Sequence, residues 1–326
     1  MLMDVVIPIS YAQAVLLGLL QGLTEFLPVS STAHMAIAPQ ILFGMRDPGA
    51  AFSAVVQLGP IAAIIWYFRD EVVRYIRGIL RTGWVSRVPA EDLDARLGWY
   101  TLLGTIPLII FGVLLEKKID TVFRSLNIIG TSLIVLGLVL WAAEILGSRR
   151  RHLSQMTLRQ SQAIGWAQVL ALVPGTSRSG VTITAGLFLG LDRESAARFS
   201  FLLSIPAITA AGLYKLIKVL KSTHLGPQAG PYLLGAAVAG IFAYVVIRWF
   251  LGYMKEHNTA LFIGYRIALG ILVLALLHAG MVKDRPPREA ALFAPARKGI
   301  VSLPGAPAEF GRNNNQLAAP HLAPQS

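Results

Sequence analysis

One polar stretch near the start of the chain carries side chains suited to an acid–base or metal site. In QGLTEFLPVSSTAH, Gln21 and Glu25 stand four residues apart, so they share one face of a helix. A carboxylate and a carboxamide oxygen suit a hard cation such as Mg²⁺ or Ca²⁺, which takes oxygen ligands. Pro28 then ends the helix. The residues after it supply hydroxyls and an imidazole: Ser30, Ser31, Thr32 and His34.

A second polar stretch, LVPGTSRSGVTI, has the composition of an anion site. It places Arg178 between Gly175 and Gly180, with the hydroxyls of Ser177, Ser179 and Thr182 close by. Small residues let backbone N–H groups approach an anion, and a helix that begins near Gly180 adds positive potential. A guanidinium can fork onto two phosphate oxygens. Together the two stretches hold what phosphoryl transfer needs, since positioning and charge neutralisation dominate that reaction.

The elements that must position these residues lie in a membrane. The chain has 326 residues, of which 55% are hydrophobic and 14% charged, against about 25% charged in a soluble domain. It has no cysteine, which excludes disulfides and thiolate metal sites. The net charge of +12 in so apolar a chain indicates cytoplasmic loops rather than nucleic-acid binding. The sequence therefore predicts an all-α polytopic membrane protein.

About six stretches are long enough to span a bilayer, which takes roughly 20 apolar residues. They are residues 52–68, 99–115, 128–146, 199–217, 233–250 and 260–280. The apolar stretches 11–45 and 160–190 are instead interrupted by the two polar motifs. Irregular backbone at membrane depth must be buried in protein or line a wet cavity. Both stretches are therefore predicted to be re-entrant helix–loop–helix hairpins.

The two halves of the chain resemble each other, which predicts an inverted repeat. Gly-x-x-Gln at Gly18 recurs at Gly165, and each copy leads through an apolar run to proline and serines. Further along, Gly137 matches Gly270 in the same order. Each half holds one hairpin and three spans, an odd number, so the halves lie with opposite orientation and their hairpins meet near the midplane.

These boundaries predict one integral membrane domain over residues 1–280, with repeats at about 11–146 and 160–280. The arginine-rich loops at 69–98 and 147–160 are predicted to be cytoplasmic by the positive-inside rule. Residues 281–326 are rich in Pro, Ala and Asn without apolar periodicity, which predicts a disordered tail that is in part a cloning remnant.

The two motifs resemble those of a known family. QGLTEFLPVSSTAH is similar to its (Glu/Gln)-x-x-x-Glu motif with a Pro-x-Ser-Ser-Thr-x-His continuation, and PGTSRSGVT is similar to its Pro-Gly-x-Ser-Arg-Ser-x-x-Thr motif. Both belong to the bacterial undecaprenyl-diphosphate phosphatases, also called bacitracin-resistance proteins. The resemblance covers about Tyr11 to Gly280.

This resemblance implies an enzyme of the bacterial inner membrane whose site opens to the periplasmic face. The reaction it implies is hydrolysis of undecaprenyl diphosphate to the monophosphate carrier and inorganic phosphate, aided by a divalent cation. The family's acidic pair falls on Gln21 and Glu25, so one carboxylate stands where two are common. Its Ser/His pair falls on Ser31 and His34, and its arginine on Arg178. The oligomeric state is left open between a monomer and a homodimer.

Several alternatives stay open at this stage. Ser31 or His34 is the nucleophile, and Glu25 or His34 takes the proton. Ser30, Ser177, Ser179 and Thr182 are expected to bind the diphosphate. Gln57 is a candidate for the cavity wall, whereas Glu144 and Arg266 are expected to pair structurally or snorkel. A secondary transporter built on the same inverted repeat is the alternative function.

Overall fold

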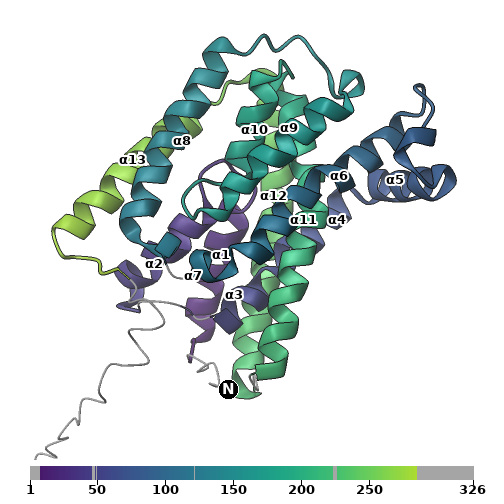
Figure 1. Ribbon diagram of the computed structural model, residues 1–326. Helices are drawn as coiled ribbons and strands as arrows, with labels where there is room; N and C mark the ends of the chain where they lie inside the picture. The colour runs from purple at the N-terminus through teal and green to yellow at the C-terminus, as the bar shows by residue number, and fades with distance from the viewer. Residues whose placement is uncertain (1–7, 46–47, 49, 121, 223–225, 285–326) are drawn as a thin grey trace, which may run out of the picture.

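The computed structural model describes residues 8–45, 48, 50–120, 122–222 and 226–284, and these residues form helices and no strand. The longer helices are α1 (Tyr11–Thr24), α2 (Ser31–Phe43), α3 (Ala50–Val56), α4 (Leu58–Tyr67), α5 (Arg69–Thr82), α6 (Leu93–Leu114), α7 (Glu116–Asp120), α8 (Leu126–Leu146), α9 (Leu158–Gln168), α10 (Arg178–Phe188), α11 (Arg193–Ser222), α12 (Ala229–Glu256) and α13 (Ala260–His278). Short 3₁₀ turns lie at Val85–Arg87, Val122–Arg124, Leu153–Gln155, Val169–Leu172 and Gly226–Gln228. The all-helical prediction is confirmed (Figure 1).

Five helices of the described chain are long and apolar enough to cross a bilayer by themselves: α6, α8, α11, α12 and α13. A sixth candidate is the bent pair Ala51–Tyr67 and Arg69–Thr82, which is long and apolar enough only when the two helices are taken together and which turns by 76° between them. The part before the bend was predicted as one span over 52–68, but it is interrupted at Gln57, between α3 and α4. The prediction of about six spans in a polytopic membrane protein is confirmed.

The segment 69–98, predicted only as a polar connection, contains the whole of α5 and the start of α6. Tyr75 and Gly78 of α5 are buried, and Gly78 lies against the Ala95 backbone of α6. The next span accordingly begins at Leu93 rather than at 99. A charged helix packed along a neighbouring span can form here because its inner face carries small and aromatic residues while its arginines stay exposed.

Both interrupted stretches are helix–turn–helix hairpins, as predicted. α1 and α2 form hairpin 1, and α9 and α10 form hairpin 2. Each second helix begins after a serine with positive φ, Ser30 at 71° and Ser177 at 66°. Their hydroxyls accept from the backbone N–H of Ala33 and Gly180, which caps α2 and α10 in the same way. In Figure 1 the turn of hairpin 2 lies next to α1 and α2.

The two halves pack on each other reciprocally, as the predicted repeat requires. α1 of the first half packs on α12 of the second, and α9 of the second half packs on α6 of the first. At the two crossings Gly18 faces the Gly235 carbonyl and Gly165 faces the Gly104 carbonyl, in contacts that leave no room for a side chain. α8 and α13, the last spans of the halves, lie side by side (Figure 1).

Glu144 anchors the end of α8 in a buried ionic cluster. Its carboxylate accepts from Arg149 and Arg193 Nε, each at 2.8 Å, and from Thr259 Oγ1 at 2.7 Å. This joins α8 to α11 and to the start of α13. A carboxylate inside a span needs such partners, because an unpaired charge in hydrocarbon is costly. Glu144 thus pairs structurally, as expected from the sequence.

The first residues predicted to belong to the tail are packed on the helical domain. Val282 is buried, and Asp284 accepts hydrogen bonds from the Ser125 hydroxyl and the Leu126 N–H at the start of α8. The packed chain therefore continues to at least Asp284. The rest of the predicted tail, residues 285–326, lies outside the described residues.

The glycine crossings give a first prediction. Gly165→Ala places a methyl group 2.8 Å from Gly104 Cα, and we expect it to destabilise the protein by about 1–3 kcal/mol through overpacking. Thermal unfolding in detergent measures the change. Gly264→Ala in α13 is the matched control, because nothing lies within 4 Å of its added Cβ. Equal melting temperatures for the two variants would contradict the close crossing.

Candidate active site

Glu25 is the centre of a hydrogen-bonded carboxamide network. It follows the last residue of α1, and Gln21 Nε2 donates to its Oε2 at 2.9 Å from one turn earlier. Gln57 Nε2, at the break between α3 and α4, donates to Glu25 Oε1 at 3.1 Å. Gln21 Nε2 also reaches Gln57 Oε1 at 3.1 Å, which closes the triangle. Three side chains from two segments thereby fix the direction of one carboxylate.

Ser31 joins this network at the beginning of α2. Its Oγ donates to Glu25 Oε2 at 2.8 Å, across the turn that Pro28 forces. A serine hydroxyl that already donates to a carboxylate is aligned to lose its proton to that group. Glu25 and Ser31 therefore have the mutual geometry of a base and a nucleophile.

Arg178 faces this pair from hairpin 2. It is the first residue of α10, and its Nη2 lies 3.6 Å from Glu25 Oε1. Its side chain is 12% exposed, yet Nη1 and Nη2 have no hydrogen-bond partner among the described residues. Buried guanidinium nitrogens normally find acceptors, so this side chain has donors left for the oxygens of an anion.

The two turns present equivalent residues to each other. Ser31 and Arg178 each follow the capping serine, so both stand at the first helical position, of α2 and α10 respectively. Both helices point their positive N-termini at the same region. Positive φ is costly for serine, and such strain gathers at functional sites. The arrangement puts a hydroxyl that donates to a carboxylate on one half and a guanidinium on the other, around one positive region.

The hydroxyls expected to bind the diphosphate have protein partners in the structure. Ser179 Oγ donates to the Leu27 carbonyl at 2.9 Å, and Ser177 Oγ lies 3.2 Å from Ser179 Oγ. Thr182 is 1% exposed; its Oγ1 donates to the Arg178 carbonyl and lies 2.6 Å from Ser200 Oγ. The two serines thus link hairpin 2 to hairpin 1, and Thr182 links α10 to α11. Ser30, also among the expected ligands, contacts the Thr32 hydroxyl at 2.9 Å and caps α2.

His34 lies close in sequence but has other partners. Its Nδ1 is 2.8 Å from the Ser30 carbonyl, which can only accept, so Nδ1 carries the proton. Nε2 then accepts from the Tyr265 hydroxyl at 2.6 Å. Among the described residues, no hydrogen bond or ion pair joins its ring to Glu25, Ser31 or Arg178. The structure therefore does not bring His34 into the acid–alcohol pair.

Sequence reasoning underrated two residues and missed a third. Gln57 was only a candidate wall residue, and Tyr265 carried no distinguishing pattern. Arg266 was expected to pair or snorkel, but it is 0% exposed and bonds to backbone carbonyls of both hairpin turns. An arginine within an apolar span was the available signal for it.

Comparison with known proteins decides the family. The family described as "Bacitracin resistance protein BacA" matches residues 14–272. The chain is 47% identical to a protein of Chloroherpeton thalassium over 83% of this chain and 98% of the relative. It is 50% identical to one of Myxococcus xanthus over 83% and 90%, and 46% identical to one of Arthrobacter sp. (strain FB24) over 85% and 97%. All three relatives are named undecaprenyl-diphosphatase.

The chain belongs to the bacitracin resistance protein family. The resemblance seen in its two motifs is thereby confirmed, and the family match includes both motifs and reaches from within α1 to within α13. Of the residues that the family motifs single out, Glu25 and Ser31 of hairpin 1 lie together opposite Arg178 of hairpin 2, whereas His34 has other partners.

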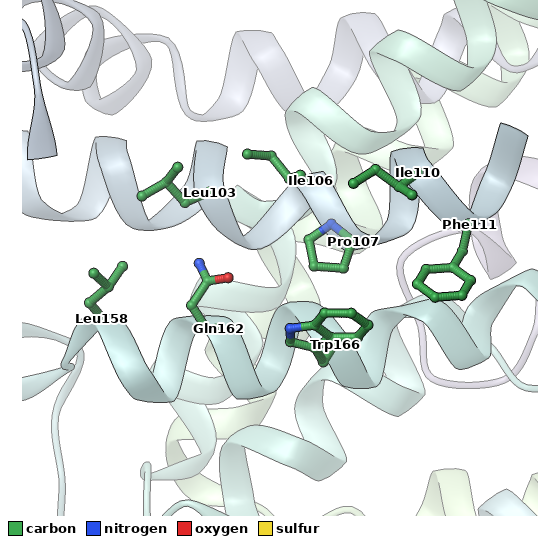
Figure 2. A pocket seen from close by; sticks show the side chains of 8 residues that line it. All are labelled: Leu103, Ile106, Pro107, Ile110, Phe111, Leu158, Gln162 and Trp166. Carbon is green, nitrogen blue, oxygen red and sulfur yellow. The ribbon is translucent and has the colours of Figure 1, made fainter. Parts of the chain in front are cut away.

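An apolar groove lies elsewhere on this family member, between α6 and α9 (Figure 2). Its volume is about 320 Å³, and its lining residues are Leu103, Ile106, Pro107, Ile110, Phe111, Leu158, Gln162 and Trp166. None of these side chains is ionisable, so the groove can hold hydrocarbon but cannot supply the chemistry. The reactive groups are confined to the two turns.

The Arg178 guanidinium, whose terminal nitrogens lack hydrogen-bond partners among the described residues, gives a second prediction. Inorganic pyrophosphate, added with a chelator, should raise the melting temperature of the purified protein, because a ligand bound only to the folded state stabilises it by RT ln(1 + [L]/Kd). Arg178→Met should abolish the rise. Arg96→Met is the control and should keep the rise. The guanidinium that it removes donates to the carbonyls of Ala90 and Met156. A rise that survives Arg178→Met would place the anion elsewhere.

Proposed function

We propose that this protein hydrolyses undecaprenyl diphosphate to undecaprenyl phosphate and inorganic phosphate. One observation carries the proposal: the Ser31 hydroxyl donates to Glu25 at 2.8 Å, next to a buried Arg178 whose terminal nitrogens lack hydrogen-bond partners among the described residues. An activated hydroxyl beside an anion clamp is what phosphoryl transfer requires. The names of its relatives supply the substrate class.

In the proposed reaction Ser31 attacks the terminal phosphorus of the diphosphate. Its Oγ forms the new P–O bond while its proton passes to Glu25 Oε2, the atom that already accepts its hydrogen bond. The bond to the bridging oxygen breaks, and the lipid monophosphate leaves with the proton that Glu25 took, which returns Glu25 to its ionised form. Glu25 then takes a proton from a water molecule that attacks the phosphoseryl phosphorus; the P–O bond to Ser31 breaks, Ser31 Oγ regains a proton from Glu25, and inorganic phosphate is released.

Arg178 and the two helix N-termini hold the charge in this scheme. The guanidinium binds phosphate oxygens, and the positive ends of α2 and α10 favour the charge that spreads over the transferred group. Gln21 and Gln57 keep the Glu25 carboxylate turned toward Ser31 through their amide hydrogen bonds. Each part therefore acts through position, which is the main resource of an enzyme for this reaction.

Ser31 is a better nucleophile in this geometry than His34, which the sequence left as the alternative. The neutral ring of His34 donates from Nδ1 to Ser30 and accepts at Nε2 from Tyr265, so neither nitrogen is directed at the acid–alcohol pair. Its contact with the Ser30 carbonyl instead supports the turn that carries Ser31.

A divalent cation fits the donor set if it is held weakly. Among the described residues no three His, Cys, Asp or Glu side chains gather around one point. Glu25 supplies one carboxylate, and Gln21 and Gln57 supply amide oxygens. Mg²⁺ is commonly held by one or two carboxylates with waters and substrate phosphates. When bound, such a cation would neutralise phosphate charge beside Glu25.

The membrane assignment extends to orientation. The chain is a multi-pass membrane protein, and we place it in the bacterial inner membrane with the site open to the periplasmic face. The arginine-rich segments 69–98 and 147–160 support this orientation, because basic loops stay in the cytoplasm. A transporter built on the same repeat is not favoured, since the relatives are named as phosphatases.

Removal of the Ser31 hydroxyl tests the function directly. Purified Ser31→Ala, given a prenyl diphosphate and Mg²⁺ in detergent, should release phosphate about 10²–10⁴-fold more slowly than wild type, the range typical for loss of a reacting group. His34→Ala should lose less, because its ring acts through the turn. Ser154→Ala, at an exposed serine in a 3₁₀ turn, is the control. Full activity of Ser31→Ala would exclude it as the nucleophile.

Restoring a second carboxylate tests the cation. A chelator should stop phosphate release, and added Mg²⁺ or Ca²⁺ should restore it. Gln21→Glu puts two carboxylates one helical turn apart, so we expect about tenfold less cation to give half-maximal activity, a change of about 1.4 kcal/mol. Gln155→Glu, at an exposed position, should leave the cation requirement unchanged. Activity that is indifferent to the chelator would exclude the cation.

A further inference from the structure

Arg266 is a fully buried cation that the proposed chemistry does not use. It lies in the first half of α13 and is 0% exposed, the largest side chain among the completely buried residues described. No carboxylate among the described residues forms an ion pair with it. A charged group at membrane depth without a counter-ion is costly, so its retention calls for another set of partners.

Those partners are backbone carbonyls of both hairpin turns. Nη1 donates to Pro28 O of hairpin 1 at 3.2 Å. Nη2 donates to Thr176 O at 2.8 Å and to Gly175 O at 3.4 Å, both in hairpin 2. Nε is 3.4 Å from the Leu133 carbonyl of α8. One planar guanidinium thus connects the two turns with α8 and α13.

These acceptors occupy equivalent places in the inverted repeat. Pro28 and Gly175 are separated along the chain by the same distance as the capping serines Ser30 and Ser177. Arg266 and Leu133 are likewise related by the spacing that relates Gly270 to Gly137. The guanidinium therefore lies where the halves meet and donates to carbonyls of both turns, among them the equivalent pair Pro28 and Gly175. Because Leu133 stands at the position equivalent to Arg266, the repeat carries one arginine here and not two.

Space for this guanidinium depends on a glycine in hairpin 2. A Cβ added at Gly180 would collide with Arg266 Nη1, its nearest neighbour. The next nearest atoms are Cβ and Oγ of Ser177, at 3.2 and 3.3 Å. Gly180 also donates its N–H to the hydroxyl of the capping Ser177. Gly180, two residues after Arg178, therefore lacks a side chain where the Arg266 guanidinium needs the space.

We propose that Arg266 is a positioning residue for the reaction. It holds the turn that carries Ser31 at a fixed place relative to the turn that carries Arg178, so that the nucleophile and the anion clamp meet one phosphoryl group. This rests on the proposed phosphatase function. Because Arg266 touches carbonyls and not the reacting atoms, its loss should disturb alignment, and a shift of about 1 Å can cost on the order of 10² in rate.

Kinetics of the full-length protein in detergent test this role. Arg266→Met keeps the length of the side chain but cannot donate, and we expect its kcat per folded molecule to fall at least tenfold with KM changed less than threefold. Arg266→Lys keeps the charge and one contact at a time, and it should recover part of kcat. Arg149→Met, which weakens the Glu144 cluster at the end of α8, is the matched control for lost stability and should keep the wild-type kcat.

The outcomes separate positioning from simple stability and from the proposed function. A wild-type kcat in Arg266→Met, or a kcat loss equal to that of Arg149→Met at the same fall in melting temperature, would overturn the inference. If Arg266→Met does not fold, Gly180→Ala is the second variant, because its methyl group displaces the Arg266 guanidinium without removing it. An unchanged kcat in Gly180→Ala would also overturn the inference. Absence of phosphate release by wild type would refute the proposed function instead.

Discussion

Two interrupted helices at membrane depth leave backbone groups that hydrocarbon cannot satisfy, and this constraint shapes the centre of the protein. Each turn solves the problem with groups from the other. Ser179 of hairpin 2 donates to Leu27 O of hairpin 1, and the Gly175 N–H of hairpin 2 reaches Thr32 Oγ1 of hairpin 1 at 3.3 Å. The contacts that satisfy the backbone are therefore the same contacts that bring Ser31 and Arg178 to one place.

Residue type and spacing were enough to predict much of this centre. Glu25 and Arg178 are charged groups inside apolar stretches, Ser31 follows close to Glu25, and proline or glycine beside them breaks the helix, so both the candidate site and its hairpins could be predicted locally. The partners of these groups could not. Gln57, Tyr265 and Arg266 reach the turns from other helices, and such contacts depend on packing between segments far apart in sequence.

Hydroxyls were the hardest residues to assign. In a membrane helix a serine or threonine can bind a ligand, or it can satisfy a nearby carbonyl. Ser31 and Thr182 look alike in sequence, yet Ser31 donates to a carboxylate and Thr182 to the backbone of its own helix. The difference arises because α1 places Glu25 beside Ser31, whereas Thr182 is enclosed by α10 and α11 with Ser200 as its neighbour.

The inverted repeat supplies symmetry, and the site depends on where that symmetry fails. The position equivalent to Glu25 in hairpin 2 is Leu172, and the position equivalent to Ser31 is Arg178. A carboxylate in place of Leu172 would repel a diphosphate. A serine in place of Arg178 would leave the negative charge of the diphosphate without a cation beside it. In the proposed reaction, one base and one alcohol on the first turn and one guanidinium on the second let the paired positive helix ends act on a single anion instead of two competing half-sites.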